Sequence, residues 1–268
     1  MRSFLVVCFV MPLLANAQVD TIYVKQWDVV RVVDATAFTL TSPARWTGRD
    51  FIKAGAVIAG TAAISFLDEP VRDFWRGKKS TVLDKFERMG NHYGKPYSAV
   101  AVTGGFYLAG LILKNEWAKE TGLILASGLG SSTVVQTFFK NAIGRARPNL
   151  NIGNYEADPF NTDSPYHSLP SGHTTVAFTT SLILARQVEQ VPIKIFFYSL
   201  ATLTAASRMY LDVHWVSDIA FGGAIAWFCA DAAMKRIEAN RFRPVARQTG
   251  IIVKMYPYPG GLSLRATL

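Results

Sequence analysis

Residues 121–148 read TGLILASGLGSSTVVQTFFKNAIGRARP, an apolar run that ends in a basic segment closed by a proline. The apolar part, residues 121–139, is longer than most strands and contains small residues such as Gly128 and Gly130. Its length and composition therefore predict a helix that approaches its neighbours closely. Five more runs share this character, and together they predict an all-α fold, a bundle of about six apolar helices. The five runs are residues 51–67, 97–113, 174–185, 191–206 and 215–233.

The composition excludes several classes of protein. The chain has 268 residues, of which 50% are hydrophobic and 18% are charged. Average soluble domains carry about 25% charged residues, so this chain is apolar and poor in charge. A disordered or collagen-like chain is thereby excluded. A membrane span needs about 20 mostly apolar residues, and several runs are shorter. The runs therefore suit either membrane helices or the buried helices of a soluble bundle.

The basic balance of the chain points to an anionic partner. The net charge is +9, which suits nucleic acid, anionic lipid or a phosphorylated substrate. The basic residues do not form one run and no nucleic-acid-binding motif is present, so we expect no nucleic-acid partner. A membrane protein with basic loops explains the same charge.

The first residues have the features of a bacterial signal peptide. Residues 1–17 read MRSFLVVCFVMPLLANA, with Arg2 before an apolar run at 4–14 and small residues at 15–17, so cleavage is expected before Gln18. The alternative is an uncleaved anchor, for which the run is short. In either case we expect the chain from residue 18 onward to begin outside the cytoplasm, in the cell envelope.

Four segments are expected along the chain. They are a signal peptide at 1–17, a lead-in at 18–50, a helical domain at 51–236 and a tail at 237–268. Within the tail, Gly250–Tyr256 and Leu262–Leu268 flank a segment rich in Pro and Gly, which predicts a short C-terminal β-hairpin. The charged linker at 68–96 is expected to be partly helical.

The first of three polar motifs begins with Lys140, at the end of the run quoted above. Lys140 and Arg147 lie seven residues apart, so on a helix they share one face. Two fixed cations on one face can hold one phosphate. Pro148 would then end the helix or turn the chain away. The alternative is a pair of basic anchors at the end of a membrane helix.

The second motif is Pro170-Ser171-Gly172-His173, directly before the run at 174–185. A helix start has unpaired N–H groups, and its dipole favours an anion there. Gly172 lets the backbone approach a ligand, Ser171 adds a hydroxyl, and His173 adds a group that titrates near neutral pH. Taken alone, the motif is equally an N-capping serine beside an unrelated histidine.

The third motif runs from Ser207-Arg208 to His214 and Asp218. His214 and Asp218 are four residues apart at the start of the last run, so they are expected to share a helix face. A carboxylate there can hold one imidazole nitrogen and leave the other free as a nucleophile or base. In a bundle whose helices alternate in direction, all three motifs lie at one end.

Together the motifs resemble the type 2 phosphatidic acid phosphatase and vanadium haloperoxidase superfamily. That family's pattern is Lys-x6-Arg-Pro, then Pro-Ser-Gly-His, then Ser-Arg-x5-His-x3-Asp, and each fixed position is present within residues 51–236. The resemblance implies that His214 attacks phosphorus, with Asp218 orienting it, and that His173 protonates the leaving alkoxide and then activates water. It also implies that the phosphate oxygens are held by Lys140, Arg147, Ser171, Gly172 and Arg208.

The resemblance implies a phosphatase that needs no metal and no cofactor, in whose site vanadate would bind as a phosphate mimic. A membrane-lipid phosphate is the favoured substrate. Phosphatidate, phosphatidylglycerophosphate, undecaprenyl pyrophosphate and lipid A phosphates all present the same group, so the lipid stays open. Three alternatives stay open as well: a soluble periplasmic acid phosphatase, a vanadium haloperoxidase, and a non-enzymatic membrane scaffold, which the filled catalytic positions disfavour.

The expected orientation in the membrane follows from the number of spans. If residue 18 is outside and all six runs span, the motifs face the cytoplasm. We expect instead that the run at 51–67, which contains Lys53, Thr61 and Ser65, does not fully span. The motifs then face the periplasm, and the basic C-terminal end lies inside. A periplasmic bundle in which no run spans is the alternative.

Overall fold

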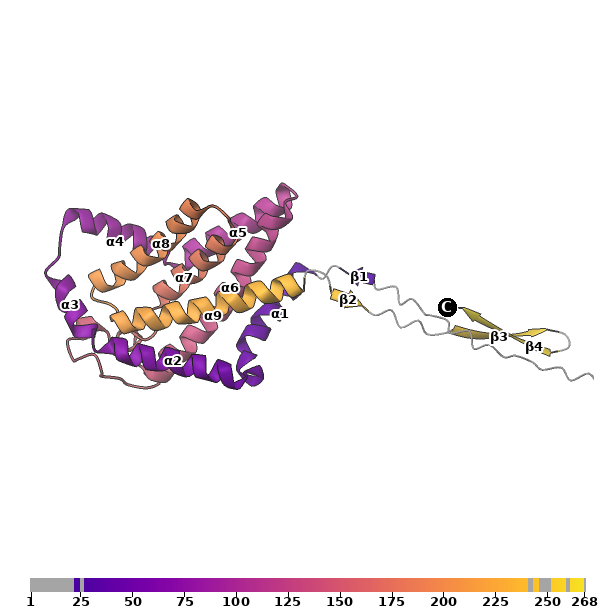
Figure 1. The fold of residues 1–268 in the computed structure, drawn as a ribbon, viewed down its shortest axis with the longest axis horizontal. Helices are drawn as coiled ribbons and strands as arrows, with labels where there is room; N and C mark the ends of the chain where they lie inside the picture. Colours follow the sequence, from indigo (N-terminus) through magenta and orange to yellow (C-terminus); the bar gives the residue numbers. More distant parts are fainter. Residues whose placement is uncertain (1–21, 25–26, 241–242, 246–251, 259–260, 268) are drawn as a thin grey trace, which may run out of the picture. The chain divides into compact units, whose positions relative to one another are not determined.

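The computed structural model describes residues 22–24, 27–240, 243–245, 252–258 and 261–267 (Figure 1). The signal peptide expected at residues 1–17 lies outside these described residues. The chain divides into two compact units. One unit is Gln26–Arg241, and the other combines Met1–Lys25 with Phe242–Leu268.

The unit Gln26–Arg241 is helical, with nine α-helices in its described part. These are α1 (Asp28–Leu40), α2 (Gly48–Ser65), α3 (Asp68–Arg76), α4 (Thr81–Tyr93), α5 (Pro96–Ile112), α6 (Glu116–Ile143), α7 (Gly172–Arg186), α8 (Val191–Tyr210) and α9 (Val216–Ala239). Three short 3-10 helices, η1 (Ser42–Arg45), η2 (Pro148–Leu150) and η3 (Ser164–Tyr166), lie in the connections.

Each of the six apolar runs is a helix, but the expected number of about six helices is wrong. The runs correspond to α2, α5, α6, α7, α8 and α9, whereas α1, α3 and α4 come from the lead-in and the charged linker. The inward face of α1 consists of Arg31, Ala35 and Thr39, which are spaced four residues apart. Because none of the three is a large apolar residue, hydrophobic periodicity could not predict this helix.

Arg31 attaches α1 to the bundle. Its guanidinium is 1% exposed, and its Nη2 donates to Glu120 Oε1 at 3.2 Å and to the carbonyl of Ile237 at 3.1 Å. Lys119 Nζ lies 3.6 Å from Asp28 Oδ2. Charged groups can remain buried in the folded protein when they are paired in this way. Ion pairs therefore hold α1 against α6, and the hydrogen bond from Arg31 holds it against α9.

The other unit contributes two strand pairs. β1 (Ile22–Val24) pairs antiparallel with β2 (Arg243–Val245), and β3 (Ile252–Tyr258) pairs antiparallel with β4 (Gly261–Thr267). The last two strands occupy the place of the expected C-terminal β-hairpin. Residues 259–260, which would form its turn, lie outside the described residues, so the hairpin itself stays a prediction.

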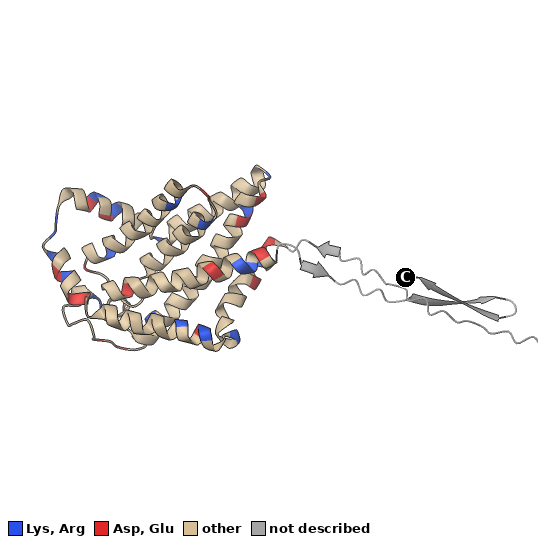
Figure 2. Cartoon of the chain, in the orientation of Figure 1, with Lys and Arg blue, Asp and Glu red and all other residues tan. Residues whose placement is uncertain are grey.

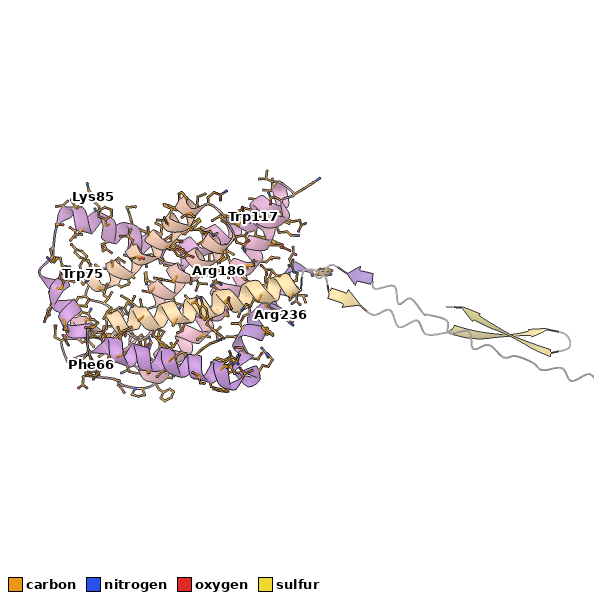
Figure 3. The ribbon with its side chains drawn as sticks, in the orientation of Figure 1. Phe66, Trp75, Lys85, Trp117, Arg186 and Arg236 are labelled. Atoms are coloured by element: carbon orange, nitrogen blue, oxygen red, sulfur yellow. The ribbon has the colours of Figure 1, made fainter. Side chains whose placement is uncertain are left out.

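The helical unit has two distinct ends. At the first, which we call the terminal end, Arg31 of α1 meets Ile237 of α9, and Trp117 Nε1 donates to the carbonyl of Gln187 at 3.0 Å. At the opposite end, the motif end, Arg145 contacts Asp68. Figure 3 shows Trp117 and Arg236 toward one end of the unit and Phe66, Trp75 and Lys85 toward the other.

Much of the helical surface is apolar. α6 and α9 are long and apolar enough to cross a membrane, and α2 with α3, bent by 49°, would make a third span. α2 has no buried residue, and Ile52 and Phe66 are 73% and 77% exposed. In Figure 2 the charged residues gather toward the two ends of the helical unit, with long uncharged stretches between them. This distribution suits helices that lie in lipid.

The contact between α1 and α9 corrects the expected orientation. Arg31 and Ile237 touch, so the start and the end of the helical unit lie together at the terminal end. A spanning bundle cannot place them on opposite faces of a membrane. If the described helices span a membrane, Arg31 and Ile237 therefore lie on one side of it, and an arrangement that separates the start and the C-terminal end of the helical unit is wrong.

We predict that the two ends of the unit are accessible from opposite sides of the membrane. Lys114, in the turn between α5 and α6, and Asn149, at the motif end, are both exposed. In a chain with Cys8 and Cys229 replaced by serine and alanine, Lys114→Cys and Asn149→Cys should react with a membrane-impermeant maleimide from opposite sides. Permeabilised membranes, where both should react, are the control. Reaction of both from one side would contradict this arrangement.

Candidate active site

The first motif spans the end of α6 and the loop that follows it. α6 ends at Ile143 because Gly144 adopts a left-handed conformation with φ 61°. Only glycine fits there, since a Cβ would lie 1.7 Å from the carbonyl oxygen of Asp158. Gly144, not Pro148, therefore ends the helix, and Arg147 lies beyond it. The expectation that Lys140 and Arg147 share a helix face is wrong.

The loop after α6 nevertheless ties Lys140 and Arg147 to one region. Lys140 Nζ donates to the carbonyl of His167 at 2.8 Å, and the backbone N–H of Arg147 donates to the carbonyl of Pro165 at 2.9 Å. Arg147 Nε is buried and has no hydrogen-bond partner. Lys140 on the last turn of α6 and Arg147 in the loop that follows are thus both tied to the segment that leads into α7.

The second motif forms the start of α7, as expected. Ser171 is the N-cap residue and is fully buried, and Gly172 is the first helical residue. A Cβ on Gly172 would lie 3.2 Å from Gln136 Oε1 and 3.6 Å from Lys140 Cε. The N-terminus of α7, with its unpaired N–H groups and positive dipole, therefore lies beside the Lys140 side chain.

The third motif places His214 just before α9 rather than on it. α9 starts at Val216, and Asp218 Oδ2 accepts the backbone N–H of Trp215 at 2.8 Å. His214 is 5% exposed, and its Nδ1 lies 3.6 Å from Asp218 Oδ2, longer than a normal hydrogen bond. The expected shared helix face is therefore wrong, although the two side chains are adjacent. Ser171 N also donates to the carbonyl of Asp218, which links the second and third motifs.

Arg208 completes the cationic group from the last turn of α8. It is 5% exposed, its Nε donates to Ser207 Oγ at 3.2 Å, and its Nη2 lies 3.7 Å from Glu87 Oε1. His173 lies next to this region, because Gly94 packs against it and the charges of Arg208 and Lys140 act on its imidazole.

Buried polar atoms without partners concentrate at this site. Seven such side-chain atoms occur among the described residues, and five of them belong to the residues around the three motifs. The five are Glu87 Oε1, Gln136 Oε1, Arg147 Nε, Arg208 Nη2 and His214 Nδ1. Because buried polar groups are nearly always hydrogen-bonded, such a cluster indicates a place where a polar ligand binds.

Arg145 is a central residue that the three motifs do not predict. It is buried, its Nη1 donates to Asp218 Oδ1 at 2.7 Å, and its Nη2 donates to Asp68 Oδ2 at 2.6 Å. Ser217 joins both sides, because it accepts from Arg145 Nη1 and its backbone N–H donates to Asp68 Oδ1 at 2.9 Å. Ser168 Oγ donates to Asp218 Oδ2 at 2.5 Å. The sequence offers one signal for this role, which is that an additional arginine, Arg145, lies between Lys140 and Arg147.

Asp212, to which the sequence assigns no role, is also fixed by α3. Arg72 Nε and Nη2 donate to its two carboxylate oxygens at 2.8 and 3.0 Å. Arg72 also donates to the carbonyl of Pro148 and, at 2.7 Å, to Asn151 Oδ1. α3 thereby holds together the loop after α6 and the turn that carries His214.

Burial sets the protonation state of both motif histidines. Desolvation lowers the pKa of His214 to about 4. Desolvation, together with the charge of Arg208, lowers the pKa of His173 to about 3. Both imidazoles are therefore neutral at neutral pH. Neutral His214 has the free lone pair that a nucleophile needs. An anion bound beside His173 would raise its pKa and favour the protonated form that an acid needs.

The described residues include no cluster of three His, Cys, Asp or Glu side chains that could hold a metal ion. The groups that converge here are cationic side chains, neutral imidazoles and the backbone N–H groups at the start of α7. This set can hold an oxyanion directly and stabilise charge that develops on it.

Part of the chain is similar in sequence to known proteins. Residues 121–242 match the sequence profile of the PAP2 superfamily. The chain is 33% identical to a lipid A 1-phosphatase of Rhizobium johnstonii over 101 residues, which are 36% of this chain and 40% of that protein. It is 31% identical to a lipid A 1-phosphatase of Rhizobium etli over 114 residues, 40% of this chain and 47% of that protein. These matches span less than half the length of both curated relatives.

A solved structure has a similar fold. It is the crystal structure of a transmembrane PAP2 type phosphatidylglycerolphosphate phosphatase from Bacillus subtilis. The TM-score is 0.51 at 21% identity, and the likeness covers 78% of this chain and 96% of that one. At this identity the likeness shows a common fold alone.

We predict that Arg145→Met destabilises the fold. The substitution leaves Asp68 and Asp218 buried without their shared cation, which should lower the free energy of unfolding by about 3–5 kcal/mol. Arg147→Met, two residues away, is the matched control, because Arg147 has no ion pair among the described residues and should cost much less. Denaturant titration of the purified proteins in detergent measures both. Equal losses in the two variants would contradict the bridging role.

We also predict a pH dependence of stability that originates at His214. The unfolded chain protonates this imidazole near its ordinary pKa of 6.5, whereas the folded chain does so only near 4. The unfolded state therefore binds more protons, and stability should fall as the pH falls through this window. His214→Gln should flatten the slope by up to about 1.4 kcal/mol per pH unit. The same substitution at exposed His92 is the control, and unchanged slopes in both variants would overturn the prediction.

Proposed function

We propose that this chain, whose residues 121–242 match the sequence profile of the PAP2 superfamily, is a phosphatase of a membrane lipid. It hydrolyses a phosphate monoester or pyrophosphate through a phosphohistidine intermediate and needs no metal. One observation carries the proposal: the charges of Lys140 and Arg147 act on the buried His214, and Arg147 and Arg208 have buried donor atoms without hydrogen-bond partners.

The cations and the start of α7 would hold the phosphate. Arg147 Nε and Arg208 Nη2 are buried donors without a hydrogen-bond partner, and Lys140 lies beside Gly172 at the helix N-terminus. A phosphate monoester offers acceptor oxygens to all of them. Ser171 adds its hydroxyl from the N-cap position.

His214 would attack the phosphorus through Nε2, since its Nδ1 faces Asp218. The bond from Nε2 to phosphorus forms as the bond to the ester oxygen breaks, and His173 gives its proton to the leaving alkoxide. The imidazolium that results is stabilised by the Asp218 carboxylate. A water molecule then attacks phosphorus, passes a proton back to His173 and releases inorganic phosphate, which restores His214.

The exposed apolar helices support a lipid substrate. A soluble enzyme for small phosphomonoesters would expose little apolar surface to water. In this chain α2 has no buried residue, and α6 and α9 are apolar enough to cross a membrane. Both curated relatives carry the name lipid A 1-phosphatase, and we extend to this chain the broader class, a lipid phosphate.

We propose that the site faces the periplasm, where envelope lipids are accessible. The motif end and the terminal end are opposite ends of the helical unit, so that orientation requires the terminal end to lie in the cytoplasm. In intact cells, the Asn149→Cys variant should react with the impermeant maleimide; reaction of Lys114→Cys alone would place the site in the cytoplasm.

We predict that His214→Ala abolishes phosphate release. Purified protein in EDTA, with a panel of lipid phosphates and one soluble monoester, should release phosphate from the lipids. The variant should be slower by at least about a thousandfold, as expected when a nucleophile is removed. His92→Ala, the same change at an exposed histidine, is the control.

Other outcomes of this experiment separate the alternatives. Full activity in the His214→Ala variant would contradict the mechanism. Release from the soluble ester alone would favour the periplasmic acid phosphatase. Failure to release phosphate from any substrate would favour a haloperoxidase, which bromide oxidation with vanadate and peroxide would detect.

A further inference from the structure

We propose that Gln136 is a further phosphate-binding side chain, contributed by α6 one turn before Lys140. It lies outside the three motifs, where the sequence shows it as a polar residue within an apolar run. The proposal rests on the proposed function, since Gln136 would bind the same phosphate as the motif residues.

The packing of α6 against α7 brings Gln136 to the site. Gly128 of α6 faces Ile183 and Thr179 of α7, where its Cβ would lie 2.8 and 3.5 Å from their side chains. Eight residues further along α6, Gln136 lies beside Gly172 at the start of α7. The two helices are therefore antiparallel, and the face of α6 that carries residues 128, 132, 136 and 140 ends at the N-terminus of α7.

Gln136 is buried without a hydrogen-bond partner for its carbonyl. The residue is 8% exposed, and Oε1 is one of the five unpaired buried atoms at the site. Burial of an amide without a hydrogen bond costs free energy, and buried polar groups therefore usually have a partner. A bound ligand would supply that partner for Gln136. Gln136 Oε1 and Lys140 Cε both approach the start of α7, because a Cβ on Gly172 would lie 3.2 and 3.6 Å from them.

The chemistry of a primary amide fits this place. An amide offers two N–H donors and one carbonyl acceptor, and a half-turn about its last bond exchanges them. Nε2 can donate to a phosphate oxygen held at the start of α7. Oε1 can then accept from Lys140, whose ammonium has three N–H donors and gives one to the carbonyl of His167. Gln136 would thus bind the anion and orient the lysine together.

The simplest competing role is space filling between α6 and α7. A leucine has a similar volume and fills the same space, but it has no donor. A glutamate keeps the shape and places a negative charge against the phosphate. The two substitutions therefore separate packing from hydrogen bonding and charge.

The test is the inhibition constant of inorganic phosphate, measured together with KM and kcat for a lipid phosphate. Gln136→Leu should raise the inhibition constant and KM by about tenfold to a hundredfold, as expected for loss of a hydrogen bond to a charged group. Gln136→Glu should raise them further. A merely structural role would change the amount of active enzyme and hence apparent kcat, but would leave the inhibition constant unaltered.

Ser132→Ala is the matched control. Ser132 lies one turn before Gln136 on the same face, is buried, and donates within its own helix to the carbonyl of Leu129. An unchanged inhibition constant in Gln136→Leu, with active wild-type protein, would overturn this proposal and leave the proposed function intact. Wild-type protein that releases no phosphate and binds none would overturn both.

Discussion

The bridge that Arg145 forms between Asp68 and Asp218 is the interaction on which the motif end depends. It joins α3, the loop after α6 and the first turn of α9 through contacts of 2.6 and 2.7 Å. Two carboxylates buried to this degree need a partner with matching hydrogen-bond geometry, which the planar guanidinium provides. Asp218 in turn accepts the Trp215 N–H at the start of α9 and thereby fixes the turn that carries His214. The position of His214, the proposed nucleophile, thus depends on the two ion pairs of Arg145.

The cations of the site divide into two groups with opposite roles. Arg72 and Arg145 have carboxylate partners and hold the loops in place. Lys140 and Arg147 have no ion pair among the described residues, and Arg208 has a single long contact with Glu87. Desolvation lowers the pKa of Arg147, because burial disfavours the charged form of its guanidinium. A bound oxyanion would offset that cost, so under the proposed function these uncompensated charges supply the affinity for phosphate.

The sequence predicts most of the site but little of what supports it. Lys140, Ser171, Arg208 and His214 could be placed at one end because they lie at the ends of successive antiparallel helices, a consequence of topology alone. The end of α6 was missed because Pro148 is the stronger local signal, whereas the tertiary contact of Gly144 with Asp158 ends the helix. Asp68 could not be predicted, since its partner Arg145 is 77 positions away and no local pattern joins them.

The origin of Asp68 in α3 limits how the catalytic region can be transplanted. The segment that matches the PAP2 profile, residues 121–242, contains the three motifs but neither Asp68 nor Arg72. Moved into another scaffold by itself, this segment would leave Arg145 with one carboxylate and Asp212 with none of its arginine contacts. The geometry of the motif end therefore requires complementarity between α3 and the motif loops, and a chimera joined at residue 121 to a chain without Asp68 and Arg72 would retain the motifs without this geometry.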